Sequence, residues 1–266
     1  MAYDSWLTPT PLSGSGNGTI TNTAETHTGR VARTTIVTVS PSVGDAKTYT
    51  VNQTAAPEFI TVSGTASVGA TETQYTVSGQ SNTSKINWTV STPGSLSPTA
   101  PSSYTANGAS ATNNANIPGD PGARAQFNFS GVIIFTANPT ISARTGTITL
   151  TAGAGGSGLV KTIIITQAAG ASTLSIAPTS ATYVQAGEGK TVKVTTNSTW
   201  TSSPSVAWLS VSPSTGGSIN TTITAKQHTG RTNRSGTVIF SVTAGGSKSV
   251  TYNATQTAKA EFVSWA

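Results

Sequence analysis

The sequence predicts an all-β protein built from tandem β-sandwich domains, and three observations lead to this fold class. The chain has 27 glycines and 13 prolines among 266 residues and is rich in Thr, and these residue types favour turns and strands over helices. Several short segments alternate apolar and polar residues, as half-buried strands do. One pattern also recurs three times, which indicates repeated modules. The clearest alternating segments are residues 48–51, 147–150 and 191–194.

The composition limits the classes of protein that the chain can belong to. Charged residues make up only 8% of the sequence, and a Ser/Thr/Gly bias of this kind can also accompany disorder. The strand periodicity favours a folded chain instead. Fourteen Lys and Arg against eight Asp and Glu give a net charge of +6, but the basic residues are scattered. We therefore expect a solvated, mildly basic surface and no nucleic-acid partner, with a polyanion-binding face as the alternative.

Cysteine usage and the N-terminal residues bear on the compartment. The chain has no cysteine, so the fold needs no disulfides. Residues 1–6 lack the basic and apolar regions of a signal peptide, and no run of about 18 apolar residues occurs. If residue 1 is the native start, we expect no signal peptide, no export by the general secretory route and no membrane partner.

The repeats are clearest near the two ends of the chain. Trp6 precedes His27 by 21 residues, and Trp208 precedes His228 by 20. A Pro and Ser/Gly turn cluster follows each Trp, and we expect Thr-Ile-Thr strands next, at residues 19–21 and 222–224. All three copies end in a strand that begins with Lys and finishes at a glutamine, which is Gln53, Gln167 or Gln256.

The repeats divide the chain into four parts. We predict an incomplete module at 1–56, a module at 57–170 with an insertion near 99–131, a module at 171–258 and a terminal strand at 259–266. The insertion is expected because the closing glutamines of the first two copies are further apart than those of the last two. A connection that long without regular structure is usually functional or mobile.

The two ends of the chain resemble parts of one module. The first copy starts at the mid-module Trp6 and lacks the opening strands of the other two, whereas residues 260–265 resemble the opening segment 57–62. Half a sandwich exposes a sheet edge and an apolar face. We therefore expect the C-terminal strand, with Phe262, Val263 and Trp265, to be donated to a sheet edge in cis or on a neighbouring copy. A disordered tail is the alternative.

Two repeated residue types are candidate contacts. His27 and His228 each precede Thr-Gly-Arg, with Arg30 and Arg231 as the arginines. These segments are interpreted either as structural turns or as a contact surface shared by two modules. The tryptophans can either fill the core or contact sugars, and for those at strand positions the core is favoured. They are Trp6, Trp88, Trp200, Trp208 and Trp265.

No pattern of catalytic or metal-binding residues is found. The eight acidic residues are scattered singly, and there is no nucleophile elbow, phosphate loop or His pair with metal-ligand spacing. The sequence therefore predicts a protein that is not an enzyme and that needs no cofactor or metal.

The repeats resemble the BACON family, an immunoglobulin-like module common in gut Bacteroidetes and their phages. The likeness is carried by residues 197–201, 208–213 and 234–238 and by Gln256. It implies tandem immunoglobulin-like sandwiches, the first incomplete, and the family name implies carbohydrate binding. The arrangement of modules is also similar to small virion proteins of crAss-like phages. That likeness implies an auxiliary capsid or head-fibre protein on the capsid exterior, assembled in the host cytoplasm. The implied partners are the major capsid protein and neighbouring copies of the chain. The alternative function is adhesion to host or mucin glycans.

Overall fold

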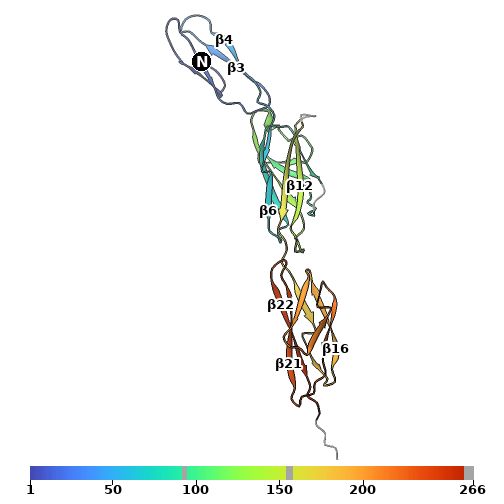
Figure 1. Ribbon diagram of the computed structural model, residues 1–266. Helices are drawn as coiled ribbons and strands as arrows, with labels where there is room; N and C mark the ends of the chain where they lie inside the picture. The colour runs from blue at the N-terminus through green and yellow to red at the C-terminus, as the bar shows by residue number, and fades with distance from the viewer. Residues whose placement is uncertain (92–94, 154–157, 261–266) are drawn as a thin grey trace, which may run out of the picture. The chain divides into compact units, whose positions relative to one another are not determined.

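The computed structural model describes residues 1–91, 95–153 and 158–260, and its regular structure is almost entirely β (Figure 1). One short 3-10 helix, η1 (Pro121–Ala123), is the single helical element among these residues. The chain forms two compact units. Unit 1 contains Met1–Val68, Glu72–Thr136 and Thr145–Thr166, and unit 2 contains Gly69–Thr71, Ala137–Arg144 and the chain from Gln167 onward.

The third module, in unit 2, is an antiparallel-rich sandwich of two sheets. The largest side chains in its core belong to Trp200, Tyr183, Phe240 and Tyr252, and all four residues are 0% exposed. They are buried because alternate residues of each strand face the opposite sheet. One sheet runs β14(Leu174–Ala177), β16(Glu188–Thr196), β20(Asn220–Ala225), β18(Leu209–Ser212). The other runs β15(Ser180–Tyr183), β22(Lys248–Gln256), β21(Arg234–Val242), β17(Trp200–Pro204), β19(Thr215–Gly216).

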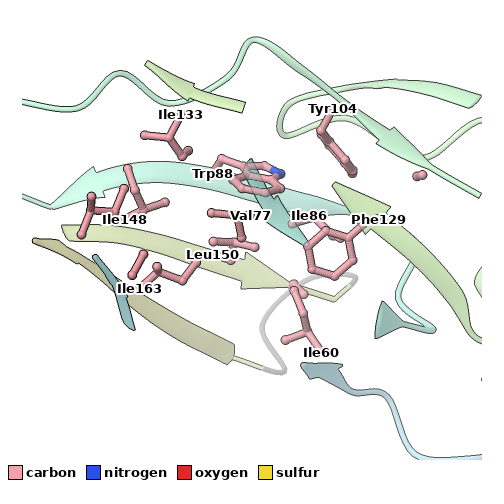
Figure 2. Close-up of a cluster of buried hydrophobic side chains, with 14 of the residues drawn as sticks. Ile60, Val77, Ile86, Trp88, Tyr104, Phe129, Ile133, Ile148, Leu150 and Ile163 are labelled. Atoms are coloured by element: carbon pink, nitrogen blue, oxygen red, sulfur yellow. The ribbon is translucent and has the colours of Figure 1, made fainter. Parts of the chain in front are cut away.

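The middle module has the same two-layer plan, and most of it lies in unit 1, whereas Ala137–Arg144 and Gln167 belong to unit 2. Figure 2 shows side chains of both layers interleaving around Trp88, and Gly131 lies so close to this ring that an added Cβ would come within 2.8 Å of it. One sheet runs β10(Ala109–Thr112), β9(Ser103–Ala106), β11(Phe127–Ile134), β7(Gln74–Ser81), β5(Ile60–Val62). The other runs β6(Thr65–Val68), β13(Leu159–Gln167), β12(Arg144–Ala152), β8(Ile86–Ser91).

The segment expected to be an insertion is more regular than a long irregular connection. It contributes the β9–β10 hairpin, which extends one sheet, then η1 and the start of β11. Asn107 and Gly108 take positive φ in the turn of the hairpin, where Asn and Gly pay the smallest steric penalty.

The first module is incomplete, as the repeats predict. It consists of two sheets of two strands, β1(Leu7–Thr10) with β2(Thr21–Ala24) and β3(Arg33–Val39) with β4(Lys47–Gln53). Only Trp6, Leu7 and Val37 are buried in its apolar cluster. Tyr49 is only half-buried, whereas Tyr252, its counterpart in the third module, is fully buried. The difference follows from the smaller number of strands that cover β4.

One expected strand is misplaced by two residues. The strand expected at 19–21 is in fact β2(Thr21–Ala24), whereas residues 222–224 do lie in β20. The pairing explains the error, since Leu7 is opposite Ala24 just as Leu209 is opposite Ala225. The single-residue difference between the copies therefore lies before this strand. The alternating segments 48–51, 147–150 and 191–194 all lie within strands, as predicted.

Candidate functional site

The residues singled out by the repeats lie in one loop that occurs in all three modules. We call it the module-end loop and define it as residues 27–33, 138–144 and 228–234. The last residue of each loop is an arginine that contacts the glutamine closing its module. The Nε to Oε1 distance is 2.8 Å for Arg33 and Gln53, 3.1 Å for Arg144 and Gln167, and 2.8 Å for Arg234 and Gln256. The repeats in the sequence identify the closing glutamines but do not show that these arginines are their partners.

The first residue of each loop closes a turn onto the carbonyl of the fifth. His27 Nε2 lies 2.7 Å from the Val31 carbonyl, and His228 Nε2 lies 2.7 Å from the Thr232 carbonyl. A carbonyl only accepts hydrogen bonds, so Nε2 carries the proton in both rings. In the middle module the Asn138 amide donates to the Ser142 carbonyl over the same 2.7 Å. This geometry favours the structural-turn interpretation of the two histidines.

The third residue of each loop ties the module to the segment that leaves it. The carbonyl of Gly29 accepts from the Ala56 amide at 2.8 Å, and that of Gly230 accepts from the Lys259 amide at 3.0 Å. In the middle module the carbonyl of Thr140 accepts from the Gly170 amide at 2.6 Å. The loop therefore fixes where the chain exits each module.

A cation–π pair supports the loop in the first and third modules. The Arg33 guanidinium lies 4.5 Å from the Trp6 ring centroid, and Arg234 lies 4.4 Å from that of Trp208. Such stacking is favourable and also shields the ring. Trp6 is 7% exposed, and Trp208 is half-buried.

In unit 1 the loop of the first module docks on the middle module through its backbone. The amides of Arg30 and Val31 donate to the carbonyls of Gly122 and Ala123, at 3.0 and 3.1 Å. Gly29 lies directly against this segment, since a Cβ there would be 2.4 Å from the carbonyl carbon of Arg124. A side chain at this position would therefore prevent the contact.

Arg30 adds charge to this contact. Its side chain is 15% exposed, forms ion pairs with Asp120 and, at 3.8 Å, with Glu58, and donates to the Asn82 carbonyl at 3.2 Å. A guanidinium in this position can hold two carboxylates at once because its five donors point in different directions. Arg231 occupies the same loop position in the third module and is exposed.

A pocket of about 510 Å³ opens beside this contact within unit 1. Its lining includes the Arg33 guanidinium, which already bonds Gln53 and the Glu25 carbonyl. Among the described residues no group of three or more His, Cys, Asp or Glu is placed to hold a metal ion. The lining residues are Asp4, Trp6, His27, Val31, Ala32, Arg33, Thr34, Ala123 and Arg124.

Two other sets of predicted residues lie elsewhere. Trp88 and Trp200 are 1% and 0% exposed, so they fill cores as expected and present no aromatic platform. Phe262, Val263 and Trp265 lie outside the described residues. No helix in the described part of the chain is long and apolar enough to cross a membrane.

Comparison with known families decides what these modules are. Residues 173–239 match the family described as "Viral BACON domain", and residues 105–168 match "Putative binding domain, N-terminal", the BACON family. The chain carries BACON-type modules. The two matches lie in the third and middle modules and include the module-end loops at 228–234 and 138–144, whereas the loop at 27–33 lies outside them. No curated protein matches the chain.

Solved structures resemble the chain only distantly. A Bacteroides ovatus GH5 xyloglucanase in complex with a XXXG heptasaccharide is 21% identical, covering 33% of this chain and 19% of its own, with a TM-score of 0.31. An endo-fucoidan hydrolase of glycoside hydrolase family 107 is 13% identical over 97% of this chain and 38% of its own, with a TM-score of 0.26. Mouse clustered PcdhgC3 EC1-3 is 9% identical over 86% and 77%, with a TM-score of 0.34. The chain thus spans about a fifth and two fifths of the two hydrolases, and these TM-scores carry no functional inference.

Proposed function

We propose that the chain is a non-enzymatic structural protein of a bacteriophage particle, an auxiliary protein that decorates the capsid exterior. The observation that carries this proposal is the match of residues 173–239 to the viral BACON family. The proposed partners are the major capsid protein and neighbouring copies of this chain. The proposed location is the outer face of the virion, reached after assembly in the host cytoplasm.

The open sheets of the first module support a role in assembly. In the third module β21 and β22 lie between β15 and β17, whereas their counterparts β3 and β4 form a sheet of two strands. Strands with unpaired edges bind further strands through main-chain hydrogen bonds. A capsid subunit or a neighbouring copy can add such a strand. The segment with Phe262, Val263 and Trp265 is the donor strand that the sequence analysis predicts.

Virions of the phage whose genome encodes the chain provide the test. We expect mass spectrometry of purified virions to detect the chain in a fixed ratio to the major capsid protein. We also expect the purified chain to co-sediment with heads that lack it, and a chain truncated after Ala260 to bind them less tightly. Virions free of the chain, or heads that do not bind it, would refute the proposal.

Carbohydrate binding is the second candidate, and two observations favour it. The family matched by residues 105–168 is described as a binding domain, and the pocket beside Trp6 has a polar, charged lining. Burial of Trp88 and Trp200 leaves Trp208 as the half-buried tryptophan of the third module. Saturable binding to an array of mucin-type glycans, abolished by Trp208→Ala with the fold intact, would favour this function over the first.

A further inference from the structure

The module-end loop of the third module offers a surface like the one that the first module uses for docking. Arg231 occupies the same position in its loop as Arg30. In each loop the histidine three residues before the arginine bonds the carbonyl of the residue that follows the arginine. The surroundings differ at the shared glycine. A Cβ on Gly29 would meet the backbone of Arg124 at 2.4 Å, whereas the three atoms nearest to a Cβ on Gly230 all belong to the His228 ring.

Unit 2 shows what covers this loop position when another module follows. Ile141 takes the place of Arg30 and Arg231 in the loop of residues 138–144, and the turn of the β21–β22 hairpin packs on it. A Cβ on Gly245, in that turn, would lie 2.5 Å from the Ile141 side chain. The Ser172 amide also donates to the Gly245 carbonyl at 2.7 Å. A hairpin tip that contains glycine is therefore one cap for a module-end loop.

The first module has the matching hairpin tip. β3 and β4 correspond to β21 and β22, and residues 40–46 join them (Figure 1). Gly44 in this tip has a positive φ of +101°, close to the +97° of Gly246. Val43 is 89% exposed, and Asp45 beside it is also exposed. The tip thus offers a glycine turn, an exposed apolar side chain and an exposed carboxylate within three consecutive residues.

We propose that a second copy of this chain docks head to tail on the first, with the 40–46 tip of one copy on the 228–234 loop of the other and Asp45 paired with Arg231. Arg30 shows that an arginine at this loop position holds two carboxylates at once. A guanidinium at this loop position can therefore bind Asp45 in addition to a contact within its own copy. Strand β3 runs from the module-end loop to the tip, so loop and tip lie at opposite ends of a module, as a head-to-tail contact requires.

The test measures self-association of the purified full chain and does not depend on any virion. We expect sedimentation velocity to show a weight-average coefficient that rises with protein concentration and falls with added salt, because the contact is charged. Arg231→Glu and Asp45→Arg should each weaken the association at least tenfold. The matched control is Lys193→Glu, which makes the same change in net charge as Arg231→Glu at an exposed position on β16 and should leave association unchanged.

Charge exchange makes the test specific for this pair of residues. An equimolar mixture of the Arg231→Glu and Asp45→Arg chains should associate again, because each junction in it unites opposite charges. The doubly substituted chain should also associate. A wild-type chain that stays monomeric up to about 1 mM, a concentration at which weak contacts are populated, would overturn the proposal. So would association that both single substitutions leave unchanged.

Discussion

Substitution of Arg30 by alanine should loosen the contact between the first and middle modules without unfolding either. The change removes two ion pairs and one hydrogen bond from a guanidinium that is 15% exposed. The Asp120 side chain is 43% exposed and the Glu58 contact is long, at 3.8 Å, so solvent screening limits the two ion pairs to about 1 kcal/mol together. Loss of the charged hydrogen bond to the Asn82 carbonyl adds about 1 kcal/mol.

The expected loss of about 2 kcal/mol corresponds to a roughly 30-fold larger population of the undocked state. Amide hydrogen exchange reports this population directly, because the Arg30 and Val31 amides donate across the contact. Both amides should exchange about 30-fold faster in the Arg30→Ala chain, while amides in β7 and β11 keep their protection. Arg231→Ala is the matched control, since it removes the same side chain from the same loop position of another module.

Two outcomes would refute this reasoning. Exchange at Val31 within twofold of wild type would mean that the guanidinium adds nothing to docking. Equal acceleration in the strands of the middle module would mean that Arg30 supports the fold of that module rather than the contact.

Three further predictions concern the loop, the closing glutamine and the buried tyrosines. Gly29→Ala should weaken docking of the first module by about 1–3 kcal/mol, because the new Cβ would lie 2.4 Å from the backbone of the middle module. Gly230→Ala should have a smaller effect, because a Cβ there would meet only the His228 side chain. Limited proteolysis should therefore cleave the first module faster in the Gly29→Ala chain than in the Gly230→Ala chain. Gln256→Ala should lower the free energy of unfolding of the third module by about 2–4 kcal/mol, measured by denaturant titration, because this fully buried amide bonds the Arg234 side chain and two backbone carbonyls. Burial raises the pKa of Tyr104 to about 12, and burial together with the Tyr252 hydrogen bond raises the pKa of Tyr183 above its usual range. Both groups favour the folded state below pH 10, the ordinary pKa of tyrosine. This stability should be lost as the pH rises through the higher folded values, and absorbance titration that finds every tyrosine ionising near pH 10 would contradict it.

The fold class could be predicted because it depends on short-range patterns. Alternation in segments such as 191–194 reports which face of a strand is buried, and the recurring Gln marks the end of the last strand in each copy. The exact register could not be predicted, as the two-residue error at β2 shows. A one-residue difference in a turn leaves the composition of the strand unchanged and moves its partners.

The candidate site was only half visible in the sequence. The repeated His-Thr-Gly-Arg pattern identified the module-end loop, because the same residues recur where the backbone takes the same turn. Its docking partner was hidden, since Gly122, Ala123 and Asp120 lie about 90 residues away in a segment without a repeat. Every residue type has a backbone carbonyl, so a contact made through backbone carbonyls cannot be predicted from the identity of the residues. The equivalence of Asn138 to the two histidines was missed for a related reason, because different side chains make the same hydrogen bond.

If a phage encodes the chain, as we propose, electron cryo-microscopy of its virion will show whether the chain decorates the capsid. We expect density outside the capsid shell that fits two complete BACON-type sandwiches and a smaller first module, with the 27–33 loop against residues 120–124. A well-resolved capsid exterior without such density, in particles that mass spectrometry shows to lack the chain, would contradict this proposal.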